Sequence, residues 1–197
     1  RMMPLLRLLA EAGLPPAPGA DRQTVGHVVS RSDTAGPDTV FACLRGHRAD
    51  GHAYAGDAYR RGARVFLCER ALSLPSDAVC IRTADARRTA AAFLFALYGH
   101  PERSFRITGI TGTKGKTTTA QFLYHLLTAR GCRTAVVGTL GLVCDGDTVP
   151  TENTTPDLFF LVPHMARLRA DGVRDLVLEL SSQALADRRV DGLPVTG

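Results

Sequence analysis

The sequence lacks the features that mark several classes of protein. Its 197 residues contain no low-complexity or repeated block, which excludes a disordered, collagen-like or solenoid protein. No stretch approaches the roughly 18 consecutive apolar residues that a membrane-spanning helix needs. The leucine-rich start is interrupted by Arg7 and Glu11, so the apolar run is too short for a signal peptide. We therefore expect a globular protein that does not associate with a membrane.

Cysteines at the spacing of a metal site or a disulfide framework are also lacking. The five cysteines lie far apart, form no C-x-x-C pair and have an odd total; they are Cys43, Cys68, Cys80, Cys132 and Cys144. This pattern argues against both a structural zinc site and a set of disulfides. A reducing compartment, the cytoplasm, fits best.

Aromatic residues are few, at 6% of the chain, and they do not alternate with basic residues. A groove that binds single-stranded nucleic acid needs such aromatic platforms beside its positive charge. The 24 lysines and arginines against 19 acidic residues give a net charge of +5, which suits an anionic partner. We therefore expect a ligand of nucleotide size and no nucleic acid.

The apolar pattern predicts two α/β units. In the first, helices are expected over residues 3–12, 52–61 and 83–98, and strands over 25–29, 39–44, 65–68 and 79–81. In the second, strands are expected over 105–110, 134–137 and 175–180, helices over 116–129 and after Pro156, and a hairpin over 140–149. The Gly-His-Pro stop at 99–101 divides the chain into domains 1–102 and 103–197.

A glycine-rich turn joins the strand 105–110 to the helix 116–129. Backbone N–H groups and the positive end of the helix converge there on one point, which suits a polyphosphate. Lys116 can reach the β- and γ-phosphates, and the Thr117 hydroxyl is placed to ligate Mg²⁺. Lys114 either adds to the positive field or is a solvated loop lysine. Isoleucine at position 110 departs from the strict G-x-x-x-x-G-K-[ST] pattern. The residues expected at the nucleotide are Gly112, Thr113, Lys114, Gly115, Lys116, Thr117 and Thr118.

A second signal is Glu179, at the end of the predicted strand 175–180. An acid at the carboxyl edge of a parallel strand points into the crevice where the phosphates lie. From the spacing alone, Glu179 either holds a metal ion or faces solvent. The fold class that follows is α/β: a small mixed α/β N-terminal domain, then a partial P-loop parallel-sheet ATPase domain. Only about three core strands of this sheet are expected, against roughly five or six in a typical sheet, so we expect a longer enzyme.

Residues 111–118 resemble the ATP loop of the Mur ligases, including the departure at position 110. Residues 152–156 and 179–185, followed by Arg189-Val190, resemble the substrate motifs of the branch that adds the third stem-peptide residue. Residues 40–46 and 50–52 are similar to the N-terminal domain of this branch, which holds the UDP end of the substrate. Where the family usually has Asp-Ser-Arg, this sequence has Arg31-Ser32-Asp33, which leaves open whether Ser32 or Ser30 meets the uracil.

The resemblance implies an ATP-dependent amide ligase of peptidoglycan synthesis. Such an enzyme joins an amino acid to UDP-N-acetylmuramoyl-L-Ala-D-Glu through an acyl phosphate, with ATP and Mg²⁺. Lys116 and Glu179 would be catalytic, and Thr117 and Glu179 would ligate the metal. The residues implied to contact the muramoyl substrate are Ser32, Asn153, Thr154, Thr155, Ser181 and Arg189. The resemblance also implies a monomeric full-length protein, whose amino-acid pocket lies beyond Gly197, so the amino acid added stays open.

The sequence leaves other interpretations of function open. Folylpolyglutamate and cyanophycin ligases share the ATP loop, although they do not explain residues 41–52 or 152–156. A non-catalytic nucleotide-binding relative is a further alternative. Residues 153–156 and the Ser181-Ser182 pair also suit helix N-caps, and Arg188 and Arg189 also suit a solvated basic pair. Gln183 stands where the family commonly has histidine.

Overall fold

The computed structural model describes residues 2–46 and 49–196 and divides the chain into two compact units, residues 1–99 and 100–197. The division falls between Gly99 and His100, both of which have positive φ angles, and Pro101 follows at once. Each unit contains a sheet with helices on both faces, so the predicted α/β class is confirmed.

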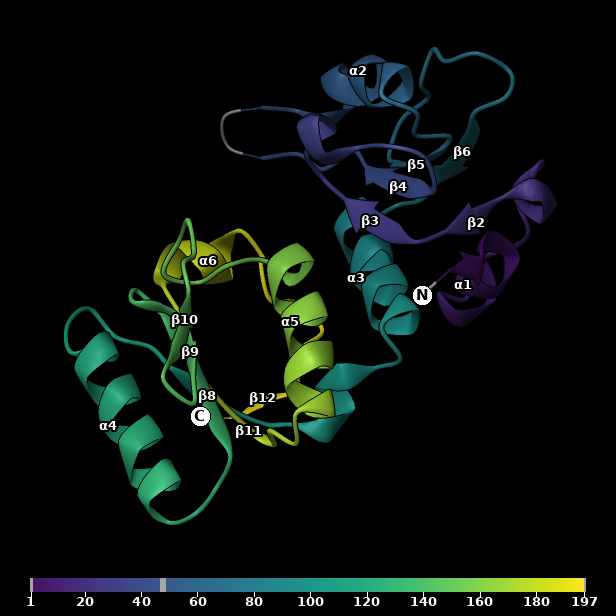
Figure 1. Cartoon of the computed structure of the whole chain (residues 1–197). Coiled ribbons are helices and arrows are strands. Elements are labelled where there is room, and N and C mark those ends of the chain that lie inside the picture. The colour runs from purple at the N-terminus through teal and green to yellow at the C-terminus, as the bar shows by residue number, and fades with distance from the viewer. Residues whose placement is uncertain (1, 47–48, 197) are drawn as a thin grey trace. The chain divides into compact units, whose positions relative to one another are not determined.

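The first unit is built on a parallel sheet in the order β3-β4-β5-β6. Helix α2 lies on one face of this sheet and α3 on the other (Figure 1). A small sheet of β1 and β2 lies beside α1. The elements are β1 (Met3–Pro4), α1 (Leu5–Glu11), β2 (Thr24–Val25), β3 (His27–Val29), β4 (Thr39–Ala42), α2 (Ala55–Arg60), β5 (Val65–Cys68), β6 (Val79–Arg82) and α3 (Ala86–Leu97).

Burial on both faces explains the continuous apolar runs of β4 and β5, in which every residue is buried. Phe41 and Phe66 pair edge to face in the centre, with ring centroids 6.2 Å apart. Burial raises the pKa of the nearby Cys43 thiol to about 12. The single strand expected over 25–29 is wrong, because the chain changes sheets at Gly26: Val25 pairs with β1, and His27 pairs with β4.

The second unit contains a six-stranded sheet in the order β10-β9-β8-β11-β7-β12. Strands β8, β11, β7 and β12 run parallel, and the β9–β10 hairpin continues the sheet in antiparallel pairing. Its elements are β7 (Arg106–Ile110), α4 (Lys116–Ala129), β8 (Thr134–Gly138), β9 (Gly141–Cys144), β10 (Asp147–Val149), α5 (Leu158–Ala170), β11 (Asp175–Glu179), α6 (Ser182–Ala186) and β12 (Val195–Thr196). The hairpin turns at Asp145-Gly146, both at positive φ as predicted.

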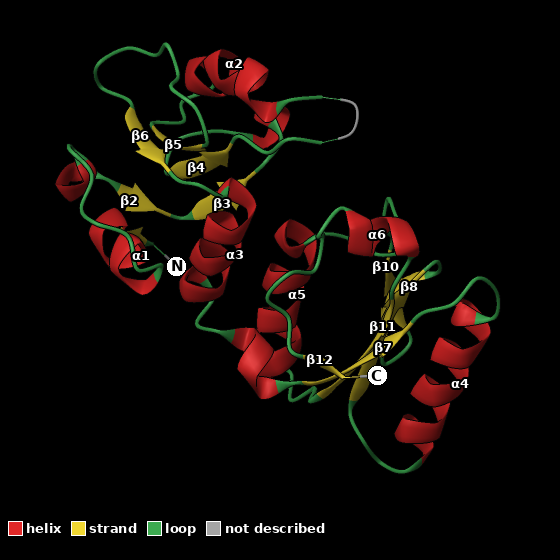
Figure 2. Ribbon diagram, turned by 180° about the vertical axis from the view of Figure 1, so that it is seen from behind, coloured by secondary structure: helices red, strands yellow, loops and turns green. Residues whose placement is uncertain are grey.

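Helices cover both faces of this sheet, with α4 on one and α5 on the other (Figure 2). Ala120 and Tyr124 of α4 pack on Val136 and Val177. Residues of α5, among them Leu161, pack on the opposite face. The register places Glu179 opposite Ile110, so β7 and β11 end at the same edge. The loop before α4 and the start of α6 therefore lie at one end of the sheet.

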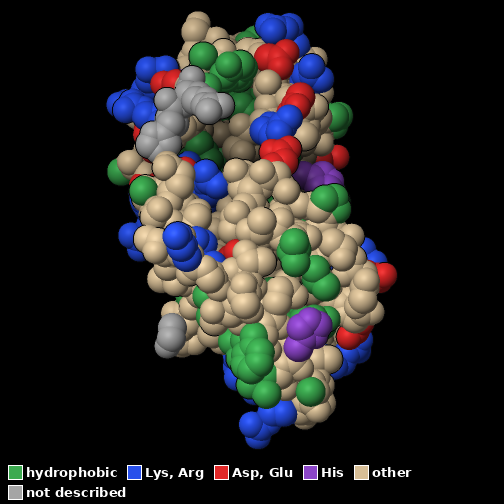
Figure 3. All heavy atoms as spheres, turned by 90° about the vertical axis from the view of Figure 1, so that its left-hand side faces the viewer, with side chains coloured by type: hydrophobic (Ala, Val, Ile, Leu, Met, Phe, Trp, Pro, Cys, Tyr) green, Lys and Arg blue, Asp and Glu red, His purple; other side chains and the backbone are tan. Residues whose placement is uncertain are grey.

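Helix α4 carries exposed apolar residues. The side chains of Phe122 and Leu126 are 70% and 46% exposed. Figure 3 views the molecule from the side of α4. Hydrophobic side chains, drawn in green, gather in the lower half of this view. Within residues 2–46 and 49–196, no helix has both the length and the apolar character that crossing a membrane requires.

Candidate functional site

The loop between β7 and α4 forms an open cradle. Gly112 and Gly115 have φ angles of 148° and 78°, a region that L side chains rarely adopt. Gly115 stands at the N-cap of α4, and as a glycine it offers no side chain to cap the first-turn N–H groups. The ammonium of Lys116 bonds to the carbonyl of Gly112 at 2.7 Å and thereby lies over the loop. These features together suit an anion at the end of α4.

Glu179 lies beside this loop and is fully buried. Its Oε2 accepts hydrogen bonds from the hydroxyls of Thr117, at 2.9 Å, and Thr139, at 3.2 Å. Its Oε1 accepts the backbone N–H of Thr139 at 3.1 Å. The carboxyl edge of the sheet therefore brings Glu179 and Thr117 together across 62 positions of sequence. A solvent-facing Glu179, the alternative left open by its spacing, is excluded by this burial.

The donor set around Glu179 fits a magnesium ion. In the described part of the chain, no basic side chain forms an ion pair with this carboxylate, although a buried charge is costly without a partner. The hydroxyls of Thr117 and Thr139 bond to it, and that of Thr154 lies 3.2 Å from the Thr139 hydroxyl. Mg²⁺ prefers such hard oxygen ligands. A cation at this edge would balance the buried charge.

Two residues of this cluster, Thr139 and Gly138, were not predicted from the sequence. Thr139 follows β8 directly and bonds to both carboxylate oxygens of Glu179. Gly138 makes room for that carboxylate, because a Cβ built there would lie 1.9 Å from Oε1 of Glu179. The available signal was a Gly-Thr pair at the end of the apolar strand β8, the next strand in the sequence after β7. The pair lies beside Glu179 because β8 is next to β11 in the sheet order β8-β11-β7, which the sequence did not reveal.

A second cluster bonds to the backbone of Glu179 and Ser181. The hydroxyl of Thr155, which is fully buried, donates to the carbonyl of Glu179 at 2.7 Å and accepts the N–H of Ser181 at 3.0 Å. Arg189 donates from Nη1 to the carbonyl of Thr155 at 3.3 Å. Asn153 is exposed two residues before Thr155. The structure therefore gathers the predicted substrate residues of the second unit near the candidate metal site.

Of the two predicted helix-cap roles, the structure shows one and contradicts the other. Ser181 does cap α6, since its hydroxyl accepts the N–H of Ala184 at 3.1 Å. The N-cap of α5 is Asp157, which accepts from the N–H groups of Phe159 and Phe160. An N-cap role for residues 153–156 is therefore wrong.

In the first unit, the exchanged charges around Ser32 pair with each other. Arg31 makes two hydrogen bonds to Asp33, at 3.1 and 2.7 Å, and the bond lowers the pKa of the Asp33 carboxyl. The Ser32 hydroxyl interacts with Asp57 of α2 and lowers the pKa of that carboxyl. An ion pair across Ser32 thus forms although the family's two charges are reversed. Ser30 is partly buried, two positions away.

The Asp50-Gly51-His52 segment has an internal structural role. His52 is buried; its Nδ1 lies 2.6 Å from Asp50, and its Nε2 accepts the N–H of Glu69 at 3.1 Å. A Cβ on Gly51 would lie 2.7 Å from the backbone nitrogen of Leu44, so only glycine fits. These bonds fix the chain after β5 to the loop after β4.

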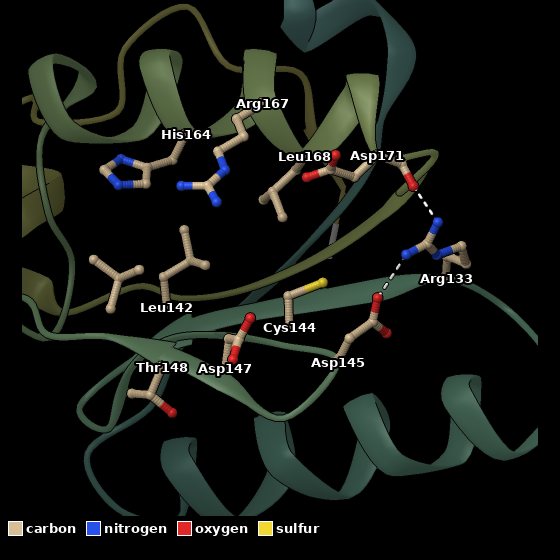
Figure 4. A pocket seen from close by; sticks show the side chains of 11 residues that line it. Arg133, Leu142, Cys144, Asp145, Asp147, Thr148, His164, Arg167, Leu168 and Asp171 are labelled. Atoms are coloured by element: carbon tan, nitrogen blue, oxygen red, sulfur yellow. Dashed lines mark hydrogen bonds and ion pairs between the residues drawn. The ribbon is translucent and has the colours of Figure 1, made fainter.

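A cavity of about 470 Å³ lies elsewhere in the second unit, between the β9–β10 hairpin and α5 (Figure 4). Leu142 and Cys144 face it from β9, and His164 and Leu168 face it from α5. An ion pair of Arg133 with Asp145 closes one end. The cavity contains none of the loop residues and is separate from the site at Glu179.

A strand, a glycine-rich loop and a helix N-terminus on a parallel sheet, with an acid at the end of the adjacent strand, define the class of P-loop α/β folds. A sequence profile described as "Mur ligase middle domain" matches residues 110–196, and one described as "Mur ligase family, catalytic domain" matches residues 24–92. The chain belongs to the Mur ligase family.

Individual relatives agree with this assignment. The chain is 33% identical over 196 residues to UDP-N-acetylmuramoyl-L-alanyl-D-glutamate--2,6-diaminopimelate ligase of Parabacteroides distasonis, covering 99% of this chain and 40% of that ligase. The ligase of the same name from Xylella fastidiosa is 36% identical over 197 residues, covering 98% of this chain and 38% of the relative. A solved structure of a ligase of that name superposes with a TM-score of 0.79 at 21% identity, covering 98% of this chain and 38% of that one, which shows the shared fold. The chain thus spans about two fifths of its relatives' length.

Proposed function

We propose that this chain supplies the ATP site and most of the muramoyl-substrate contacts of an ATP-dependent amide ligase in peptidoglycan synthesis. The substrate would be UDP-N-acetylmuramoyl-L-alanyl-D-glutamate, and the amino acid would become the third residue of the stem peptide. The observation that carries the proposal is a pair of hydrogen bonds at Glu179, in the segment 179–185. Its carboxylate bonds to Thr117 of the loop, and its carbonyl bonds to Thr155 of the segment 152–156. The relatives' names support the substrate and offer 2,6-diaminopimelate as the amino acid.

The reaction needs an activated carboxylate, because a carboxylate oxygen is a poor leaving group. Transfer of the ATP γ-phosphoryl group to the substrate carboxylate gives an acyl phosphate, and the incoming amine then displaces phosphate to form the amide. The loop N–H groups and Lys116 would hold the phosphates in position and offset their charge. Lys116 would exchange its bond to the Gly112 carbonyl for a phosphate oxygen.

Magnesium would be held by Thr117 and Glu179, with Thr139 orienting the carboxylate. When bound, the metal would supply charge neutralisation at the ATP phosphates. Arg189, whose planar guanidinium suits a carboxylate, would contact an anionic group of the muramoyl dipeptide. Ser32 would contact the uridine end from the first unit. Because the substrate is a water-soluble UDP-sugar peptide and all five cysteines are free thiols, we place the reaction in the cytoplasm.

Calorimetric titration with UDP-N-acetylmuramoyl-L-alanyl-D-glutamate tests the substrate class. We expect saturable heat from this ligand and at least about tenfold weaker binding of UDP-N-acetylglucosamine, which lacks the dipeptide carboxylates that Arg189 would pair with. A folate serves as the control for the folylpolyglutamate alternative. Tighter binding of the folate than of the muramoyl dipeptide would overturn the proposed substrate.

A further inference from the structure

Arg189 is held from two sides. Its Nη1 donates to the Thr155 carbonyl at 3.3 Å, and its Nη2 donates to Oδ2 of Asp187 at 2.9 Å. The Asp187 carboxylate is held in turn, because Gln183 donates to its Oδ1 at 2.9 Å. Only 22% of the Arg189 side chain and 15% of the Asp187 side chain are exposed. The guanidinium therefore has a fixed direction before any ligand arrives.

The backbone after α6 creates this arrangement. Arg188 adopts a left-handed conformation, with φ of 57°, which is unfavourable for a residue with a side chain. The turn lets the N–H of Arg189 reach the carbonyl of Ala184 at 2.9 Å and directs the arginine back to Thr155. The side chain of Arg188 instead bonds to Asp191 at 2.6 Å. Two adjacent arginines thus form separate ion pairs of unequal exposure.

We propose that Asp187 is a positioning residue, which holds the Arg189 guanidinium in the orientation that receives the anionic group of the substrate. This inference rests on the proposed function. A guanidinium has five N–H donors, and the bonds to Thr155 and Asp187 use two of them. Among residues 2–46 and 49–196 Arg189 has no further partner, so three donors stay available to a ligand. A side chain fixed in advance loses less conformational freedom on binding. Asp187 also brings a negative charge that weakens attraction of an anion, so the two effects predict opposite results for its removal.

Calorimetry with UDP-N-acetylmuramoyl-L-alanyl-D-glutamate on the whole chain distinguishes the preorganisation of Arg189 from the effect of the negative charge of Asp187. We expect Asp187→Ala to weaken binding roughly tenfold, the scale of one charged hydrogen bond lost from a preorganised site. Asp187→Asn keeps an acceptor oxygen for Arg189, and we expect it to restore affinity to within about threefold of wild type. Asp191→Ala is the matched control, since it removes the neighbouring ion pair of Arg188; we expect a change of less than about twofold.

A second readout needs no substrate. In nitrogen-15 NMR spectra of the free wild-type chain, we expect the Arg189 Nη protons to exchange slowly with water, and Asp187→Ala to remove that protection while Asp191→Ala keeps it. Unchanged Arg189 signals in Asp187→Ala, or an affinity equal to or above that of wild type, would overturn the positioning role. A wild-type chain that does not bind the muramoyl dipeptide would instead overturn the proposed function, and the NMR result would still decide the role of Asp187.

Discussion

Lys116→Ala is expected to lower the affinity of the chain for ATP about 100-fold in the presence of Mg²⁺. The substitution removes the ammonium that lies over the loop, bonded to the Gly112 carbonyl. A charged hydrogen bond to phosphate is worth up to about 3 kcal/mol, which corresponds to this loss. Binding is measured by calorimetry at constant salt, because screening weakens every phosphate contact.

Lys114→Ala is the matched control for this prediction. Lys114 is exposed two positions earlier on the same loop, and no hydrogen bond or ion pair of its side chain is found in the described part of the chain. Lys114 is among the residues predicted at the nucleotide, but its exposed side chain favours the alternative of a solvated loop lysine. We therefore expect its removal to change ATP affinity less than about threefold. Circular dichroism should show both variants folded, because both lysines are solvent-accessible. Equal losses in the two variants would show that only the summed charge of the loop matters and would contradict the role of Lys116.

Gly138→Ala is expected to destabilise the second unit by about 1 to 3 kcal/mol, the range for overpacking a filled interior. The added methyl group would lie 1.9 Å from Oε1 of Glu179 and 2.3 Å from its Cδ, so the carboxylate must move. Movement breaks its bonds to Thr117 and Thr139. Urea denaturation followed by circular dichroism measures the loss, and weaker Mg²⁺ dependence of ATP binding should accompany it.

Two further variants locate the cause of this destabilisation. Gly36 has open space around its Cα and no positive φ, so Gly36→Ala should change the free energy of unfolding by less than about 0.5 kcal/mol. In a Glu179→Ala background the clash is absent, and Gly138→Ala should then cost much less than in wild type. The same cost in both backgrounds would show that Gly138 serves a purpose other than making room for Glu179.

Elements with a strong local pattern were predictable from the sequence. Helix α4 and strand β5 begin and end at the predicted residues, and the hairpin turns at Asp145-Gly146 as its positive φ angles require. Short pairings were missed, because β1 and β12 each have two residues and no periodicity of their own. Their strand character comes from partners that lie far away in the sequence, as for Val195 opposite Ile107.

The candidate site was predictable from the sequence only for residues that belong to a recognisable motif. A Gly-Lys-Thr turn between a strand and a helix locates Lys116 from the sequence. The position of Glu179 at the end of a strand left both a metal role and a solvent-facing role open, until the pairing of β11 with β7 placed it beside the loop. Thr139 belongs to no motif, and its place depends on β8 lying next to β11. Asp187 was hidden for another reason, since a charged residue beside two arginines is typical of a solvated surface. Only the left-handed turn at Arg188 reveals that one arginine points inward.

We expect one chain to bind ATP at the loop and the muramoyl dipeptide beside Glu179. Amide chemical-shift mapping by NMR of this 21.1 kDa chain tests it most directly. We expect Mg²⁺-ATP to shift residues 112–118, and the muramoyl dipeptide to shift residues 153–155, Ser181, Arg189 and Ser32. Unchanged signals of both sets, with shifts around another surface such as the cavity between the hairpin and α5, would contradict both proposed sites.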